Sequence, residues 1–449
     1  MRLASVSART IFALALPIIL ARATQTVIGF CDAMMVAPLG AEALAATTTG
    51  ALNSYSLVMF PMGAVFIVQS FASQLIGRGD PIAARRYAYY GLGFAVVFGA
   101  LALLAIPLVR PVLSLFGYAP TVAKLMGDYL VIRLIGTGAV VGTEALGNWY
   151  CGMGRPGMQM KAGVVAMGLN VLLCWVLIYG KLGAPALGVA GSAWASTIAS
   201  TIGFVFLLMS FLREPVQSSP LSRNELVRFL RFGVPNGFNW FLEFASFTLF
   251  INVMIGHLGT LPLAGINVVL QINGVAFMPA LALGSAGAIL VGQAIGRNAR
   301  DEVLGIVRTT AFIAIAWMLS IAVVYLVAAE AILQLFAPSG ADGAALSEVG
   351  ALILRLSAGW QLFDAIVIVV GEALRAAGDT RWCMWTRIVV GWPVFLPLSG
   401  AAIFWWGGGV TTAILSIIVY LAILAVLFLW RILSGEWKKI ELIDPILSG

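Results

Sequence analysis

Histidine is almost absent from this chain, and charged residues are scarce. Among 449 residues there is one histidine, His257, and only 10% are Asp, Glu, Lys or Arg. A single histidine excludes a metal centre built on two histidines and argues against a Ser-His catalytic pair. Neither a P-loop nor a dinucleotide-binding glycine fingerprint occurs. We therefore expect a protein that is not an enzyme and that carries no cofactor.

Two further absences narrow the class of protein. The four cysteines lie inside or beside apolar runs without paired spacing, so neither a disulfide framework nor a zinc site is predicted. The formal charge of +7 arises from basic residues scattered singly between apolar runs. Without a basic stripe, no nucleic-acid partner is expected.

Apolar residues dominate what remains. Hydrophobic residues make up 61% of the chain, whereas soluble domains are typically about 45–50% apolar and about 25% charged. Apolar runs of about 20 residues, long enough to cross a bilayer, recur throughout the sequence. They predict twelve spans, near residues 10–36, 47–75, 87–110, 122–150, 160–180, 188–212, 230–256, 263–294, 304–330, 345–373, 383–405 and 409–434.

The sequence repeats itself at an offset of about 219 residues. Residues 40–46 match 259–265, and the QLIGR segment at 74–78 matches QAIGR at 293–297. With six spans in each half, equivalent elements lie on the same side of the membrane, as in transporters built from parallel repeats. The predicted fold is therefore an all-α membrane protein with twelve transmembrane helices in two pseudo-symmetric six-helix lobes.

Polar segments set the expected domain boundaries and orientation. Residues 1–213 form an amino-terminal lobe, 214–228 a cytoplasmic linker, 229–434 a carboxy-terminal lobe and 435–449 a cytoplasmic tail. Most Lys and Arg residues lie at the termini or around loops after even-numbered spans. The positive-inside rule then places both termini in the cytoplasm of a bacterium, with the chain in the inner membrane. One chain holds both halves of a pathway, so a monomer is expected.

Acidic residues inside spans are the first functional candidates. An ionisable group at the centre of a membrane helix costs about 2.5–3.5 kcal/mol on insertion scales, so it commonly marks a functional site. The deepest are Asp32, Glu243 and Asp364. Glu243 and Asp364 belong to the same half, and two facing carboxylates would hold a proton or Na⁺ readily. The alternative is that each acid accepts hydrogen bonds or pairs with an arginine.

Uncharged polar and aromatic residues inside spans could line a substrate cavity. The candidates are Asn170, Asn239, Gln271, Asn273, Trp360 and Gln361. Hydrogen bonding between membrane helices is the alternative explanation for the amides.

Two arginines at matched positions suggest structural ion pairs. Arg133 and Arg355 lie a few residues after Asp128 and Glu348, respectively. A symmetry-related ion pair in each half is the expectation. Glu144 is expected near a cytoplasmic end, within reach of water.

Several segments together resemble the multidrug and toxic compound extrusion (MATE) transporters, in particular their NorM-like branch. The similar segments are Pro17 with Asp32, residues 40–46, 74–78 and 152–156, Asn170, and residues 187–195, 361–365 and 374–380. The resemblance implies a two-lobed bundle of twelve helices in the lipid bilayer. The bundle would alternate between inward-open and outward-open forms and export cationic or amphipathic small molecules in exchange for Na⁺ or H⁺. The resemblance also implies cation binding at Glu243, Asp364 and Asp32, with Na⁺ possible at the first two.

Two departures from the family pattern leave the coupling ion open. Asn267 stands where related sequences often carry a histidine, and Trp360 stands where a tyrosine is common. The alternative function is a lipid-linked saccharide flippase of similar build, which should have a strongly basic cavity. Here the central residues are mainly acids, so cationic cargo is favoured.

Overall fold

The computed structural model describes residues 7–215, 220–336 and 341–443. These residues form helices joined by short turns, and none of them lies in a β-strand. Eleven helical segments are long and apolar enough to cross a membrane, and a twelfth span joins two helices bent by 48° at residue 136. In lipid, helices satisfy every backbone hydrogen bond within one segment. The predicted all-α fold with twelve spans is confirmed.

Each predicted span corresponds to one helix or to a run of consecutive helices. The spans of the first half are α1 (Ala8–Val36), α2 (Ala41–Phe66) with α3 (Val68–Gly77), α4 (Pro81–Ala105) with α5 (Val109–Leu113), α6 (Pro120–Ile135) with α7 (Thr137–Gly152), α8 (Gly157–Tyr179) and α9 (Val189–Leu212). Those of the second half are α10 (Arg223–Leu249), α11 (Thr260–Gly296), α12 (Val303–Gln334), α13 (Ala341–Ser357) with α14 (Gln361–Ala376), α15 (Thr380–Val389) with α16 (Leu396–Phe404), and α17 (Val410–Ser434).

The helices pack into two compact units. The N unit comprises Leu16–Gly237, and the C unit comprises Met1–Ala15 with Phe238–Gly449. Both boundaries between the units fall inside helices, within α1 and α10. Because α10 begins at Arg223, residues 223–228 of the expected linker are already helical.

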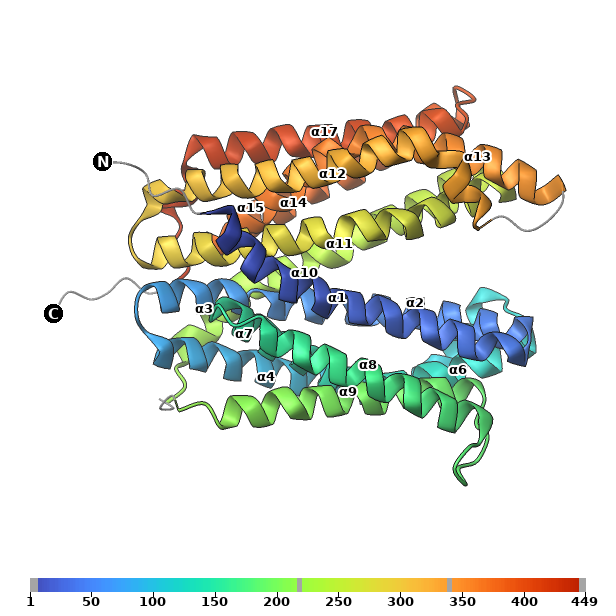
Figure 1. The fold of residues 1–449 in the computed structure, drawn as a ribbon, viewed down its shortest axis with the longest axis horizontal. Helices are drawn as coiled ribbons and strands as arrows, with labels where there is room; N and C mark the ends of the chain where they lie inside the picture. Colours follow the sequence, from blue (N-terminus) through green and yellow to red (C-terminus); the bar gives the residue numbers. More distant parts are fainter. Residues whose placement is uncertain (1–6, 216–219, 337–340, 444–449) are drawn as a thin grey trace. The chain divides into compact units, whose positions relative to one another are not determined.

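Helix neighbours repeat from one unit to the other. In the N unit the fourth span, α6 with α7, packs against the second, third and sixth spans. In the C unit the tenth span, α13 with α14, packs against the eighth, ninth and twelfth. Figure 1 shows α11, α12 and α17 running lengthwise within the C unit, and α4, α8 and α9 within the N unit. The sequence repeat is therefore also a repeat of packing.

Backbone turns repeat at the level of single hydrogen bonds. Gly40 and Gly259 precede the second and eighth spans with φ of 110° and 118°, a conformation that only glycine adopts readily. The N–H of Gly40 donates to the carbonyl of Ala37, and that of Gly259 to Gly256, both at 3.2 Å. This shared geometry explains why the glycine occurs in both halves.

The turn after the second span is also repeated, with one substitution. Asp80 N–H donates to the Leu75 carbonyl at 2.9 Å, and Ala299 N–H donates to the Ala294 carbonyl at 2.8 Å. Asn298 has φ of 61° where the first half has a glycine with φ of 82°. Asparagine tolerates the left-handed region better than most residues, so the turn is preserved.

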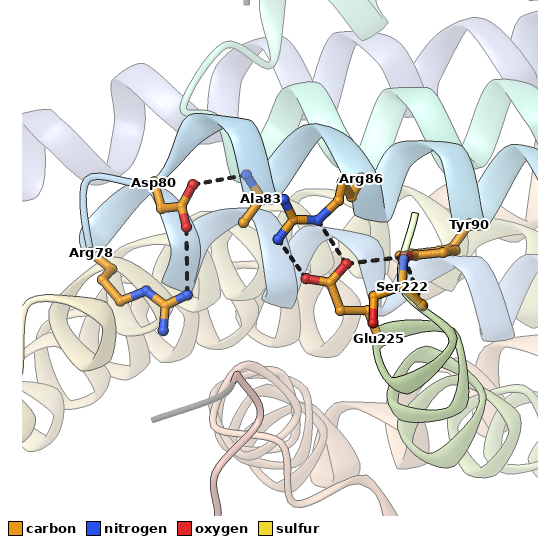
Figure 2. Close-up of polar contacts among 7 residues, drawn as sticks. All are labelled: Arg78, Asp80, Ala83, Arg86, Tyr90, Ser222 and Glu225. Carbon is orange, nitrogen blue, oxygen red and sulfur yellow. Dashed lines mark hydrogen bonds and ion pairs between the residues drawn. The ribbon is translucent and has the colours of Figure 1, made fainter. Parts of the chain in front are cut away.

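Hydrogen bonds among polar side chains connect the start of α10 to α4 within the N unit (Figure 2). Arg86 makes two hydrogen bonds to the Glu225 carboxylate, from Nε at 2.7 Å and from Nη2 at 2.6 Å. The Tyr90 hydroxyl accepts from the Ser222 N–H at 2.7 Å and lies 3.0 Å from the Glu225 carboxylate. Paired guanidinium–carboxylate bonds of this kind fix geometry as well as adding stability.

The same region caps the first turn of α4. The Asp80 carboxylate accepts a hydrogen bond from the Ala83 N–H at 2.8 Å and lies 3.7 Å from the Arg78 guanidinium (Figure 2). Asp80 is therefore an N-cap residue that satisfies an otherwise unpaired donor.

We predict that Arg86→Gln lowers the stability of the protein by roughly 1–3 kcal/mol, because Glu225 would keep its charge in a poorly hydrated place. The measurement is the midpoint of thermal unfolding of the purified protein in detergent. Arg110→Gln is the matched control, since its ion pair with Asp128 is exposed, with 75% of the Arg110 side chain accessible. An equal effect of the two substitutions would contradict the prediction.

Candidate functional site

Glu243 and Asp364 approach each other within the C unit from two different helices. Glu243 lies two turns after Pro235 in α10, and Asp364 lies in the first turn of α14. A 3-10 segment, Ala358–Trp360, interrupts the tenth span just before α14. The two carboxylates are close enough to interact electrostatically. The first turn of a helix also favours a negative charge, because the helix dipole is positive there.

A third charged side chain joins this pair. Arg387, in α15, forms an ion pair with Glu243 through Nη1 and Oε1, and it also interacts electrostatically with Asp364. We call Glu243, Asp364 and Arg387 the charged triad. The sequence does not single out Arg387, because this residue lies beside the basic residues of a loop that follows an even-numbered span. Its position four residues inside the predicted span 383–405 was the available signal.

Aromatic residues surround the charged triad. The Arg387 guanidinium carbon lies 5.4 Å from the centre of the Phe428 ring, a cation–π contact. Tyr420 is buried and interacts electrostatically with all three charges of the triad.

Both helices that supply the Glu243–Arg387 pair continue into a π-helical segment, Phe250–Ile255 after α10 and Val390–Phe395 after α15. Such segments frequently occur at functional sites.

Five of the predicted cavity residues also lie in the C unit. Gln361 donates to the Asn273 side-chain oxygen at 2.6 Å, so these two amides are brought together. Trp360 is buried in the hydrophobic core, whereas Gln271 is exposed on α11. Asn239 is buried, one turn before Glu243 on α10, and its side-chain oxygen has no hydrogen-bond partner in the described part of the chain.

Asp32 lies in a separate, hydrogen-bonded site of the N unit. Its carboxylate accepts from the Ser196 hydroxyl at 2.7 Å and from the Cys174 thiol at 3.1 Å. Asn170, predicted as a cavity residue, donates to the same Ser196 hydroxyl at 3.0 Å. Asp32 and Asn170 thus belong to one cluster, which we call the Asp32 cluster. All of its members are buried.

The N unit contains a buried ion pair as well. Arg22 in α1 donates to Glu144 in α7 at 3.2 Å, with 17% and 10% of the two side chains exposed. Asn148 donates to the second carboxylate oxygen of Glu144 at 3.2 Å. The expectation that Glu144 lies within reach of water was therefore wrong, because it is enclosed by these two partners.

The ion pairs expected for Arg133 and Arg355 were also wrong. Asp128 pairs with Arg110 at 3.1 Å, and Arg355 pairs with Glu330 at 2.8 Å. In both observed pairs the two residues lie on neighbouring helices. Each expected pair lies on a single helix, where residues three or four apart are the ones that come into contact.

We predict that Arg22→Gln destabilises the protein by about 3–5 kcal/mol, because it leaves Glu144 buried without a counter-charge. The double variant Arg22→Gln with Glu144→Gln should recover most of this loss, since both groups are then neutral and can hydrogen-bond. Thermal unfolding of the four proteins of this cycle measures the coupling. Independent, additive effects would show that the pair is not coupled.

Comparisons with known proteins agree with this architecture. The family model MatE matches residues 17–176 and 235–399. A probable multidrug resistance protein NorM from Rhizobium meliloti (strain 1021) is 28% identical over 93% of this chain and 91% of its own. A probable multidrug resistance protein NorM from Agrobacterium fabrum (strain C58 / ATCC 33970) is 27% identical over 88% of this chain and 87% of its own.

A solved structure has the same fold. It is described as an outward-facing conformation of a multidrug resistance MATE family transporter of the MOP superfamily. It superposes with a TM-score of 0.87 at 20% identity, over 96% of each chain. The matched ranges of the family model cover both repeats, and from this we conclude that the chain is a multi-pass membrane transporter of the MatE family.

Proposed function

We propose that the chain is a secondary active multidrug exporter that antiports cationic or amphipathic compounds against Na⁺ or H⁺ by alternating access. The observation that carries the proposal is the approach of Glu243 and Asp364 from α10 and α14 inside one membrane-spanning unit. Ionisable groups at this depth are costly and typically mark ion or substrate pathways. The names of the curated relatives, multidrug resistance proteins, support the substrate class.

Competition provides the coupling in this proposal. A cation bound at the carboxylates favours one arrangement of the lobes and a cationic compound favours the other, so each ligand shifts the equilibrium by its differential affinity. An ion that enters down the membrane potential supplies about 2.3 kcal/mol per 100 mV. That free energy corresponds to roughly a 50-fold concentration ratio for each net charge moved.

The proposal extends to orientation and organisation. Basic residues around the loops after even-numbered spans support cytoplasmic termini in a bacterial inner membrane. The lobes are residues 1–213 and 229–434, joined by the linker at 214–228 and followed by the tail at 435–449. The repeated packing and the repeated turns support two equivalent lobes in a functional monomer.

Two sets of residues complete the proposal. Asp32 provides a third cation-binding carboxylate, and its cluster of hydrogen-bond donors, among them Ser196 and Cys174, would stabilise its charge. Residues proposed to contact the exported compound are Asn170, Asn239, Gln271, Asn273, Trp360 and Gln361. Among these, Asn170, Asn239 and Gln361 each have a buried side-chain oxygen without a hydrogen-bond partner in the described part of the chain, which a bound compound could supply.

We predict that Glu243→Gln and Asp364→Asn each reduce gradient-driven efflux of a fluorescent cationic dye at least tenfold, because each removes a charge from the exchange site. The assay uses proteoliposomes with an imposed Na⁺ or H⁺ gradient. Glu330→Gln is the matched control, since this acid is 65% exposed and pairs with Arg355 away from the triad.

Each outcome of this assay has a distinct meaning. Efflux that survives in both variants would return the two acids to a structural role. Absence of dye movement in every sample, including the unmodified protein, would favour the flippase.

A further inference from the structure

The charged triad contains a positive side chain, which a cation site made of two carboxylates does not require. It combines two carboxylates with one guanidinium, and Arg387 is bound to Glu243 directly. A guanidinium remains charged at every physiological pH. One of the two negative charges is therefore neutralised permanently by the protein, and the second, on Asp364, is left for an external partner.

Arg387 reaches Glu243 from the protein interior. Only 13% of the Arg387 side chain is exposed, compared with 40% of the Glu243 side chain. Phe428 covers the guanidinium. Gly371 leaves room for the Phe428 and Arg387 side chains, because a Cβ at this position would lie 3.0 Å from the Phe428 ring and 3.7 Å from Arg387 Nη2. The arginine is thus held in place by packing, while the carboxylate it binds stays accessible.

The repeat identifies the counterparts of the ion pair in the N unit. Counted back from the repeated glycine before the second and eighth spans, Glu243 on α10 corresponds to Thr24 on α1. Counted forward from Pro17 and Pro235, so that the π-helical segment of the seventh span is not crossed, it corresponds to Gln25. Counted forward from the matching turns after α7 and α14, Gly163 on α8 corresponds to Arg387 on α15.

Neither of these positions on α1 carries a charge, and Thr24 touches Gly163. A Cβ placed on Gly163 would lie only 2.6 Å from the Thr24 hydroxyl oxygen. The N unit therefore brings α8 and α1 together through a glycine and a threonine, at the level in the repeat where α15 and α10 of the C unit carry the arginine and the glutamate. Helix packing alone does not require an ion pair there, which indicates that Arg387 has a role beyond holding the helices together.

A metal cation and Arg387 would compete for the same place. An alkali-metal ion shared by both carboxylates would have to bind oxygens of Glu243 while lying beside a fixed positive charge. Like charges at such short range repel strongly inside a protein, where screening by water is weak. Hard cations also require several oxygen ligands, and Arg387 already occupies one carboxylate oxygen of Glu243.

We propose that Arg387 is a specificity-determining residue whose guanidinium fills the cation position beside Glu243 and excludes alkali-metal ions from the carboxylate pair. Asp364 then accepts a single exchangeable positive charge, either a proton or the cationic group of an exported compound. This inference rests on the proposed function, because it names the coupling ion of the same site. It selects H⁺ over Na⁺ for this chain.

The test is equilibrium binding of radioactive ²²Na⁺ to the purified full-length protein in detergent. We expect Arg387→Gln to bind Na⁺ at least tenfold more tightly than the unmodified protein, and adding Asp364→Asn to this variant to abolish the gain. Arg387→Lys keeps the charge and should behave as the unmodified protein does. Arg355→Gln, which removes an exposed arginine of the same unit, is the matched control.

Two results would overturn the proposal. One is saturable Na⁺ binding by the unmodified protein that Asp364→Asn removes. The other is a folded Arg387→Gln protein, verified by its thermal unfolding, with no gain in Na⁺ affinity. The first result requires no Arg387 variant, so the test holds even if Arg387→Gln does not fold. Because binding is measured without transport, failure here is distinct from loss of efflux in the proteoliposome assay.

Discussion

Charges inside hydrocarbon must find their counter-charges within the protein, and this constraint shapes the interior of both units. An unpaired charge is expensive there. Arg22 is bound to Glu144 in the N unit, and Arg387 to Glu243 in the C unit. In each case the partners come from different spans, so the ion pair also contributes to helix packing.

Two acids remain after these pairs are formed, and they are stabilised differently. Asp32 is surrounded by hydrogen-bond donors, among them Ser196 and Cys174. Asp364 lies in the first turn of α14, where the helix dipole favours a negative charge, and it interacts electrostatically with both Glu243 and Arg387. Asp32 and Glu243 also occupy different positions along the repeat, because Asp32 lies 8 residues before Gly40 whereas Glu243 lies 16 residues before Gly259. The duplicated halves are therefore alike in packing but unlike in their chemistry.

The sequence predicted the fold well because lipid imposes a simple rule. Long apolar runs must become helices, and Gly40 and Gly259 recur because their backbone conformation excludes most other residues. The convergence of Glu243 with Asp364 followed from their depth and shared half. Side-chain partners were harder to predict, because they depend on how distant helices are rotated. Arg387 is 144 residues from Glu243 in the sequence, and it follows other basic residues of the adjacent loop, so nothing in the sequence links it to Glu243.

The contact between Gly163 and Thr24 has a consequence for how this scaffold could change over evolutionary time. A duplicated protein carries two versions of each helix contact, and one version can acquire charge while the other preserves the original spacing of the backbone. The neutral version shows that the helices can meet without the arginine and the glutamate. The charge at such a helix contact could therefore change by substitution at two positions, without any alteration of the fold that holds them.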